Sequence, residues 1–455
     1  MAPDTLFSDL YACGSARALA QSAYTLIEDI FPICRSITGN GVRATLDLLA
    51  RRIPLVRTEV PSGTAVFDWV VPSEWNVREA YIADASGERI VDVQRNALHL
   101  MGYSAPVRTR LSLDELQSHL HSIPNHPEWI PYRTSYWRET WGFCITQRLR
   151  DTLMAGDYEV VIDTMLQPGS LTLGECFVPG ELQDEFVIFT HSCHPAMAND
   201  NASGLAVATV FASELLRRKP RLSYRFVFAP ATIGSITWLA LNADKARAMR
   251  AGLVIGLLGD RGALTYKRSR KGNSEIDAVG ARVVRALDPH ARVVDFSPYG
   301  YDERQFCSPG FDLSVGRLTR SSNGEYPEYH TSADNPSLMD VAAIEQSIRA
   351  LAHIVSRIDG NPRLRRRDGG LCEPRLGKHG LFRPTGGQAP QEFEYAMLWL
   401  LNQSDGKHGP NDVADAAGLP DGLVRAAAEA LLAAGLVEEV EVESTHRTPA
   451  AAPVT

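Results

Sequence analysis

The longest apolar runs lie in the middle of the chain, and they alternate with stretches whose apolar residues recur at helical spacing. The run from Glu185 to Thr190 has the length of a buried strand, and residues 204–217 place their apolar side chains on one side of a helix. Further strand patterns at 224–228 and 252–258 are each followed by a helical pattern. This alternation between residues 170 and 357 predicts a doubly wound, mixed α/β sheet.

Helical and β patterns of a different kind precede this region. Residues 15–30 have helical spacing, and a turn-rich stretch, 31–43, leads into a second helix. From Val66 to Ser170, apolar and polar residues alternate within short, aromatic-rich segments. Turns that contain Pro, Gly and Asn separate these segments, which predicts a mostly β module. We therefore predict N-terminal helices of a catalytic domain at 1–65, an inserted β-rich lid domain at 66–165, and the catalytic domain itself at 166–360.

Two polar stretches in this first half leave alternatives open. In residues 31–43, Arg35, Ser36 and Arg43 either hold an anion or form a polar connection between two helices. In residues 130–137, aromatic side chains interleaved with Arg133 either line a pocket or form the core of a small β domain.

The C-terminal region predicts a winged-helix domain. Residues 361–390 are a Pro/Gly/Arg-rich linker, and the pattern of three helices and a β wing follows in residues 391–445. This domain has eleven acidic residues against Lys407 and Arg425, so it lacks the charge to neutralise phosphates. We expect no nucleic-acid binding but a protein contact, with a homo-oligomer as one option. The tail, 446–455, is expected to be disordered.

Composition narrows the class of protein. The chain has 455 residues, enough for two or three domains, and a formal net charge of −8. We find no signal peptide and no apolar stretch of about 20 residues that could span a membrane. The seven cysteines are scattered and form no CxxC pair. These features predict a reduced, cytoplasmic protein without membrane contact.

The loop HSCHPAMANDNASG, residues 191–204, is the first candidate for a site because it joins a predicted strand to a predicted helix. Ligands in open α/β sheets bind at the carboxyl ends of strands. Imidazoles and carboxylates are the usual zinc ligands, and a catalytic zinc takes three from the protein. His191, Asp200 and His330 are the candidate ligands, although a buried histidine or a helix-capping Asp explains each alone. Cys193 is a further candidate ligand or nucleophile.

Several motifs together resemble a known family. NDNASG after a strand-borne histidine, a strand that runs into a Gly-Ser turn, and the late YHTSAD resemble the zinc-dependent aminopeptidase-like exopeptidases, whose fold glutaminyl cyclases share. More closely, nearly the whole chain resembles a bacterial branch of that superfamily. Its members combine an aminopeptidase-like catalytic domain, an inserted β domain and a C-terminal winged helix. The matching strings are FPICRSITGNGVR, PSEWNV, IPYRTSYW, WGFC, THSCHPAMANDNASG, TIGSI, PYGYDERQFCSPGF, PEYHTSADN, LGKHG and SDGKHG.

The resemblance assigns roles to individual positions. His191 and Asp200 match the first histidine and the metal-bridging aspartate of the aminopeptidases, and His330 matches their late histidine ligand. Two other ligands of their two-metal centre are replaced here, one by Thr232 and one by Leu258. The resemblance therefore implies one zinc ion, held by the two histidines and the aspartate.

A further departure concerns the general base, which the branch is expected to carry as Glu in P-E-T-I-G-S. This chain has Ala231 there, and the loss of a general base costs about 10²- to 10⁴-fold in rate. Either Ala231 is an inactivating substitution that traps a substrate, or it is natural. In the second case Glu303, Asp302 or Glu328 serves instead, or the site only binds. His194 is an alternative metal ligand or a proton-handling group.

We expect a zinc-dependent amide or peptide hydrolase that acts on a small peptide-like or modified amino-acid metabolite, in a biosynthetic pathway for natural products. A substrate α-amine would suit an acidic pair in the pocket, whereas a carboxylate would suit arginines. Two alternatives stay open: a cyclase or acyltransferase that uses the same zinc, and a non-catalytic binding or assembly protein. The predicted pocket residues are Arg35, Arg133, Tyr136, Asp302, Glu303 and Tyr329.

Overall fold

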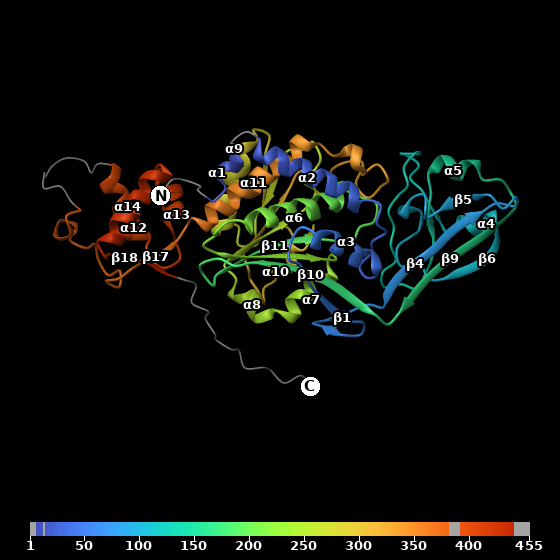
Figure 1. The fold of residues 1–455 in the computed structure, drawn as a ribbon, viewed down its shortest axis with the longest axis horizontal. Coiled ribbons are helices and arrows are strands. Elements are labelled where there is room, and N and C mark those ends of the chain that lie inside the picture. Colours follow the sequence, from blue (N-terminus) through green and yellow to red (C-terminus); the bar gives the residue numbers. More distant parts are fainter. Residues whose placement is uncertain (1–5, 12–13, 382–391, 441–455) are drawn as a thin grey trace.

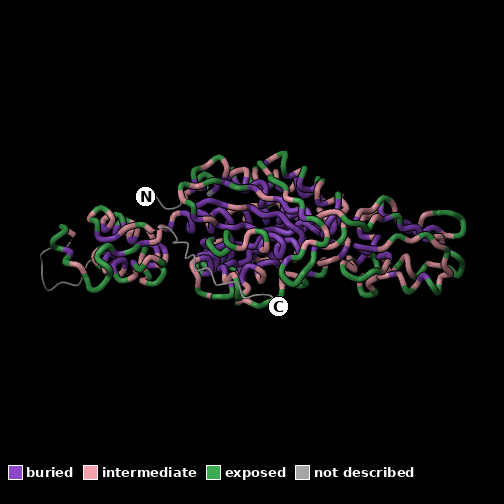
Figure 2. The backbone as a smooth tube through the Cα atoms, turned by 90° about the horizontal axis from the view of Figure 1, so that it is seen from below, coloured by how far each residue is buried: buried purple, intermediate pink, exposed green. Residues whose placement is uncertain are grey.

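The computed structural model describes residues 6–11, 14–381 and 392–440. The chain is elongated, with a central α/β part between a β-rich part and a small helical part (Figure 1). Buried residues are most concentrated in the central part (Figure 2). No helix of the described ranges is long and apolar enough to cross a membrane. The predicted disordered tail, 446–455, lies outside them.

The central part is built on an eight-stranded mixed sheet, which confirms the predicted doubly wound α/β fold. Four neighbouring strands, β12, β11, β13 and β16, run parallel, and antiparallel strands flank them. In spatial order the strands are β1 (Val56–Pro61), β10 (Ser170–Val178), β12 (Ser223–Ala229), β11 (Glu185–His191), β13 (Ala251–Ile255), β16 (Val315–Thr319), β14 (Thr265–Lys267) and β15 (Arg292–Val294).

Helices cover both faces of this sheet, which explains the continuous apolar runs. In β11, Phe186 and Ile188 pack into the core of one face, and Val187 and Phe189 pack into the core of the other. The first face is covered by α2 (Ser15–Ile30), α6 (Gly204–Leu215), α9 (Glu275–Leu287) and α11 (Val341–Asp359), with α1 (Ser8–Tyr11) and α3 (Asn40–Ala50) beside them (Figure 1). The second face is covered by α7 (Ile233–Leu241), α8 (Ala243–Ala248) and α10 (Glu303–Phe306).

The predicted β-rich insertion is a four-stranded antiparallel sheet in the order β5-β4-β9-β6. Its apolar residues, such as Trp75 and Val160, belong to the same core as Val227 and Val254 of the central sheet. The insertion is therefore packed onto the central part. Its elements are β2 (Ala65–Val66), β3 (Trp69–Val70), β4 (Glu74–Ala83), β5 (Arg89–Asp92), β6 (Val107–Ser112), α4 (Leu113–Gln117), β7 (Leu120–His121), β8 (Phe143–Cys144), α5 (Gln147–Thr152) and β9 (Asp157–Gln167).

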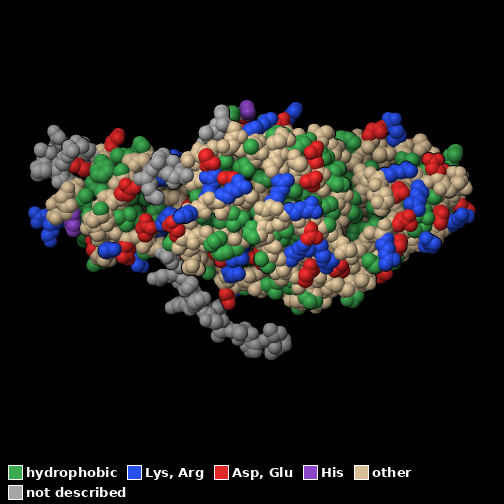
Figure 3. Space-filling model, viewed as in Figure 1, with side chains coloured by type: hydrophobic (Ala, Val, Ile, Leu, Met, Phe, Trp, Pro, Cys, Tyr) green, Lys and Arg blue, Asp and Glu red, His purple; other side chains and the backbone are tan. Residues whose placement is uncertain are grey.

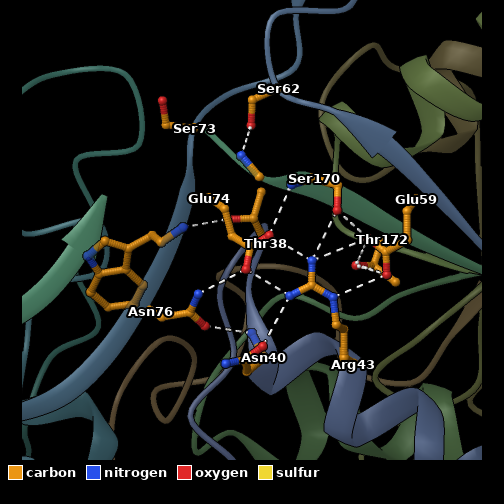
Figure 4. Close-up of polar contacts among 12 residues, drawn as sticks. Thr38, Asn40, Arg43, Glu59, Ser62, Ser73, Glu74, Asn76, Ser170 and Thr172 are labelled. Carbon is orange, nitrogen blue, oxygen red and sulfur yellow. Dashed lines mark hydrogen bonds and ion pairs between the residues drawn. The ribbon is translucent and has the colours of Figure 1, made fainter. Parts of the chain in front are cut away.

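A salt-bridge cluster fixes the root of the insertion (Figure 4). Arg43 of α3 donates to both carboxylate oxygens of Glu74 on β4, at 2.7 and 2.6 Å, and its Nε lies 3.1 Å from Glu59 on β1. It also donates to Ser170 on β10. These strands lead into and out of the insertion. Arg43 thus has the structural role that we considered for this polar stretch, and not an anion-binding role.

Replacing Arg43 by alanine should lower the free energy of unfolding by about 2–3 kcal/mol, because it leaves the partly buried carboxylate of Glu74 and the exposed one of Glu59 without their cation. The hydrogen bond from Arg43 lowers the pKa of Glu74 to about 2, so this stabilisation is present above about pH 4.5 and is lost as pH falls toward 2. Urea unfolding at several pH values measures both effects.

The matched control for this variant is Arg57→Ala, because Arg57 pairs with Asp47 on the surface. Surface pairs contribute at most about 1 kcal/mol. Equal losses in the two variants, or an unchanged pH dependence in Arg43→Ala, would contradict the assignment.

The C-terminal part has the predicted winged-helix elements α12 (Glu392–Gln403), α13 (Pro410–Ala417), α14 (Asp421–Ala433) and β18 (Val437–Val440). Asp421, the first residue of α14, accepts hydrogen bonds from Arg357 at 2.8 Å and from Arg282 at 3.2 Å. The start of the helix that reads DNA in many winged-helix proteins thus contacts the central part. On the face in Figure 3, basic and acidic side chains are interspersed.

The predicted linker at 361–390 needs a correction. Residues Arg363–Arg366 form strand β17, which pairs antiparallel with β18. Leu364 is buried in the core of the winged helix, whereas Arg365 bonds Glu438 at 2.9 Å on the partner strand. The three arginines in this strand hide its single apolar position, which is why its pattern resembled a linker.

Candidate metal centre

The loop after β11 is buried from His191 to Gly204. His191 ends the strand, residues 198–203 form an irregular helical turn, and α6 follows directly. β12 runs parallel to β11 and ends beside it at Ala229, so the turn that contains Ala231 lies at the same edge of the sheet. This is the position that the sequence predicted for the site.

Asp200 lies at the centre of a cluster of three histidines. Its Oδ1 is 2.8 Å from Nε2 of His191 and 3.5 Å from Nδ1 of His194, and its Oδ2 is 3.0 Å from Nε2 of His330. The hydroxyl of Tyr301 donates to Oδ1 at 2.7 Å. One ligand atom from each of His191, His194 and Asp200 lies within 4.8 Å of the others. The structure therefore brings together the three predicted ligands and adds His194.

This donor set fits a zinc ion. His194 Nδ1 is buried and has no hydrogen-bond partner among the described residues. This nitrogen faces the Asp200 carboxylate and is available to bind a metal ion. Burial lowers the pKa of His194 to about 3. Burial alone would raise the pKa of Asp200, but the neighbouring histidines hold it well below its usual range. A neutral imidazole and an ionised carboxylate are the states that metal binding requires.

Buried polar side chains hold the loop in this shape. Asn201 donates to the carbonyl oxygen of His191 at 3.0 Å. Asp334 accepts hydrogen bonds from the backbone N–H of Asn199, at 2.6 Å, and of Asp200, at 3.0 Å. Sequence reasoning missed Asp334, although it ends the YHTSAD string, and it also missed Tyr301. Asp334 follows the candidate ligand His330 by four residues, and this spacing was the signal in the sequence that could have identified it.

The inserted domain fixes the position of His330. Ser332 N–H donates to the carbonyl oxygen of Ile130 at 2.9 Å, and Tyr132 N–H donates to that of His330 at 2.8 Å. His330 has a φ of +56°, which a non-glycine residue adopts only when its surroundings impose it. The ring of Tyr132 also meets those of His194 and His330 edge-on.

A cavity of about 540 Å³ opens beside the cluster, between the inserted domain and the catalytic part. Residues from both parts line it. Trp69 and Trp137 come from the insertion, and Tyr299 and Tyr301 come from the catalytic part. The predicted site residues on its wall are Arg133, Tyr136, His194, Ala231, Tyr329 and His330.

Asp302 and Glu303, both predicted pocket residues, do not line this cavity. Both side chains are fully buried. Asp302 accepts a hydrogen bond from Ser235 at 2.6 Å, and Glu303 pairs with Lys267 at 2.9 Å. Residues Glu303–Phe306 form the short helix α10, which turns these carboxylates toward the core and leaves Tyr301 at the cavity.

Arg35, the third predicted pocket residue that is absent from the wall, is only 1% exposed. Its Nη1 donates to the carbonyl oxygen of Ile30 at 2.5 Å. Burial lowers the pKa of Arg35 to about 10, and the charge of Arg35 adds to the effect of burial in lowering the pKa of His194. Burial raises the pKa of Cys193 to about 12, so this thiol is not an activated nucleophile.

Ala231 lies on the cavity wall, where its methyl group replaces the expected carboxylate. None of the described residues that line the cavity is Asp or Glu. Glu328, the remaining candidate substitute, is not among them. Thr232 is on the wall, and Leu258 is buried in the core.

Comparisons with known proteins agree with this geometry. Residues 24–361 match the family described as a domain of unknown function, DUF4910, and residues 363–439 match a winged helix-turn-helix family. A Clostridium acetobutylicum protein named "Putative polysaccharide biosynthesis protein with aminopeptidase-like domain" is 47% identical over 418 residues, which are 92% of this chain and 96% of that protein.

Two solved structures are similar to this fold. The crystal structure described as a "putative peptidase" from Clostridium acetobutylicum has a TM-score of 0.82 at 46% identity and covers 93% of this chain and 97% of that one. A zinc aminopeptidase from Bacillus subtilis has a TM-score of 0.55 at 12% identity over 74% of this chain and 95% of that one, so it shares the fold. The chain therefore belongs to the DUF4910 family, whose zinc aminopeptidase-like fold it combines with an inserted β sheet and a C-terminal winged helix.

Proposed function

We propose that the protein is a zinc-dependent amide hydrolase of aminopeptidase-like type that acts on a small peptide-like or modified amino-acid substrate. The observation that carries the proposal is the buried cluster of His191, His194 and Asp200, of which His194 lines a cavity of about 540 Å³. A cavity of this size suits a small molecule. Its position between the inserted part and the central part would restrict access by long chains.

His191, His194 and Asp200 would hold the zinc, because their ligand atoms already converge. This set differs from the predicted one, in which His330 is the third ligand. His330 bonds the second oxygen of Asp200 and faces the cavity. It would orient the carboxylate and contact the substrate. A zinc ion bound there supplies Lewis-acid polarisation of an amide carbonyl and activation of water.

The tyrosines of the wall would orient the substrate. The hydroxyls of Tyr132 and Tyr136 lie 2.8 Å apart, and burial holds the pKa of Tyr132 well above its usual range. Both phenols therefore stay protonated and can donate to a substrate oxygen. Tyr301 donates to Asp200 and so fixes the orientation of the carboxylate.

The absence of a carboxylate from the described wall favours a second candidate function, a zinc-dependent protein that binds the same small molecule without turning it over. The position expected to hold the general base is Ala231, and no other described side chain on the wall supplies a carboxylate to replace it. The name of the Clostridium relative, with its reference to polysaccharide biosynthesis and an aminopeptidase-like domain, supports a biosynthetic setting for either function.

The metal assignment is tested by comparing His194→Ala with His330→Ala. We expect zinc affinity to fall by about 10- to 100-fold in His330→Ala, which loses a hydrogen bond to a ligand, and by more in His194→Ala, which loses a ligand. Metal content by mass spectrometry and competition with a chromogenic chelator measure the difference. The reverse order would restore the predicted set of His191, Asp200 and His330. Zinc affinity unchanged in both would contradict the site.

The hydrolase itself is tested by incubating the zinc-loaded protein with a library of small amides in H₂¹⁸O. Hydrolysis places ¹⁸O in the carboxylate product, whereas cyclisation or acyl transfer does not. Because Ala231 removes the base, the decisive comparison uses the glutamate variant described in the Discussion.

A further inference from the structure

The wall of the cavity carries positive side chains and no negative ones among the described residues. Arg133 lines it from the inserted domain, and Arg304 lines it from α10 of the catalytic part. Nη1 of Arg304 donates to the carbonyl oxygen of Pro298 at 3.3 Å, a neutral acceptor that leaves its charge uncompensated. The inserted part and the central part therefore each contribute one arginine to the lining of the cavity.

The nearby carboxylates do not offset this charge. Glu303 is neutralised by Lys267, whose Nζ also donates to two carbonyl oxygens. Asp302 faces Ser235, and burial raises its pKa to about 7. Asp200 belongs to the metal cluster. A substrate α-ammonium would therefore find no free carboxylate on the described wall.

Two further guanidinium groups lie behind the wall. Arg35 is almost fully buried, and its Nε and Nη2 have no hydrogen-bond partner among the described residues. Arg317 stacks on the ring of Tyr301 with its Cζ 4.4 Å from the ring centroid, and it bonds Asn323. A buried guanidinium without a carboxylate is costly. Buried cations beside the cavity raise its positive potential.

Aromatic side chains form the entrance. Trp69 and Trp137 are 44% and 52% exposed, and their ring centroids are 5.6 Å apart. Both line the cavity, as does the exposed Tyr299. These rings offer an apolar surface for a flat or ring-shaped part of a ligand.

We infer that the cavity selects an anionic amide, such as an N-acyl amino acid, whose carboxylate is bound by Arg304 and Arg133, and that it rejects a substrate with a free α-ammonium. This inference rests on the proposed function for the amide, but the charge preference is a property of the wall. The charge preference distinguishes the protein from an enzyme that removes N-terminal residues, because such an enzyme must bind the free α-ammonium group of its substrate.

Three phenylalanine derivatives test the preference, because they share one ring and differ in charge. N-acetylphenylalanine is an anion, N-acetylphenylalaninamide is neutral and phenylalaninamide is a cation at pH 7. Isothermal titration calorimetry with the zinc-loaded protein should give an affinity at least about 10-fold higher for the anion than for the cation, the scale of one charge-assisted hydrogen bond. Titration of the chelator-treated protein shows how much of the affinity comes from zinc.

Arg304→Gln and Arg133→Gln should each weaken binding of the anion by about 5- to 50-fold and leave binding of the neutral amide within about 2-fold. Arg138→Gln is the matched control, since Arg138 follows Trp137 on the same loop, is exposed and is not part of the wall. It should leave all three affinities unchanged.

Several results would overturn the inference. They are equal or tighter binding of the cation, failure of the anion to bind at millimolar concentration, and arginine variants that change all three affinities alike. Failure of the proposed function would look different. In that case the anion binds in an arginine-dependent manner, but no variant with glutamate at position 231 hydrolyses any amide.

Discussion

Replacing Ala231 by glutamate should raise amide hydrolysis by the zinc-loaded protein by about 10²- to 10⁴-fold, the usual contribution of a positioned general base. The methyl group of Ala231 is on the cavity wall at the edge of the sheet where the histidine cluster lies. No other described residue of the wall supplies a carboxylate. The gain should appear in kcat, because a base acts in the transition state and contributes little to ground-state binding. Liquid chromatography with mass detection of the products measures it.

Ala231→Gln is the control for this variant, since glutamine has the shape of glutamate without its basicity. It should hydrolyse no faster than the unaltered protein. If the glutamate variant binds zinc and substrate but gains no rate, position 231 is not the general base, and the protein is then better described as a binding protein. Equal gains with glutamine and glutamate would mean that shape, not proton transfer, limits the rate.

Asp200→Asn should lower zinc affinity by at least about 10²-fold, more than any single histidine variant. Both oxygens of Asp200 face imidazoles, and Tyr301 donates to one of them. Asparagine keeps the size of the side chain but removes the negative charge and turns one acceptor into a donor. Chelator competition measures the affinity, and circular dichroism of the metal-free protein verifies the fold.

Asp302→Asn is the matched control, because Asp302 is another fully buried acid near the cavity that does not touch the cluster. Its zinc affinity should stay within about 3-fold of the unaltered protein. If both substitutions weaken zinc binding equally, the effect comes from general electrostatics of the site and Asp200 is not a ligand.

The inserted domain contributes more than a cover to this site. It supplies part of the cavity wall, shares a core with the central sheet, and pairs residues 130–132 with the loop of His330. Its root is fixed by the carboxylates around Arg43. The cavity and the cluster are therefore built jointly by the insertion and the central part, which suits a site that needs preorganised ligands.

The sequence by itself determined the central fold and the place of the site. Apolar runs such as 185–190 are continuous because both faces of the sheet are covered, so their pattern predicts buried parallel strands. The carboxyl ends of such strands collect functional loops, and His191 ends strand β11 while Asp200 lies in the loop that follows it. Local sequence was enough for these features because strand, loop and helix are consecutive in the chain.

Only the tertiary structure decided which polar residues face the cavity. Asp302 and Glu303 carry charges in a loop rich in Gly and Pro, yet both turn inward to Ser235 and Lys267, whereas Tyr301 faces Asp200. The direction of a side chain in an irregular segment depends on partners far away in the sequence, and local pattern does not encode them.

Long-range contacts also decided the third and fourth members of the cluster. His330 lies 130 residues from Asp200 in the sequence, and backbone hydrogen bonds from the insertion hold its loop. His194 is six residues from Asp200, but its ring faces the carboxylate only in the folded, buried loop after β11. Three of the four residues of strand β17 are arginines, so its sequence shows no strand pattern. The strand forms because it pairs with β18, where Glu438 neutralises Arg365. The periodicity of apolar residues specifies which helices and strands form. Charge pairing and burial between distant segments specify which of their side chains form the candidate metal site.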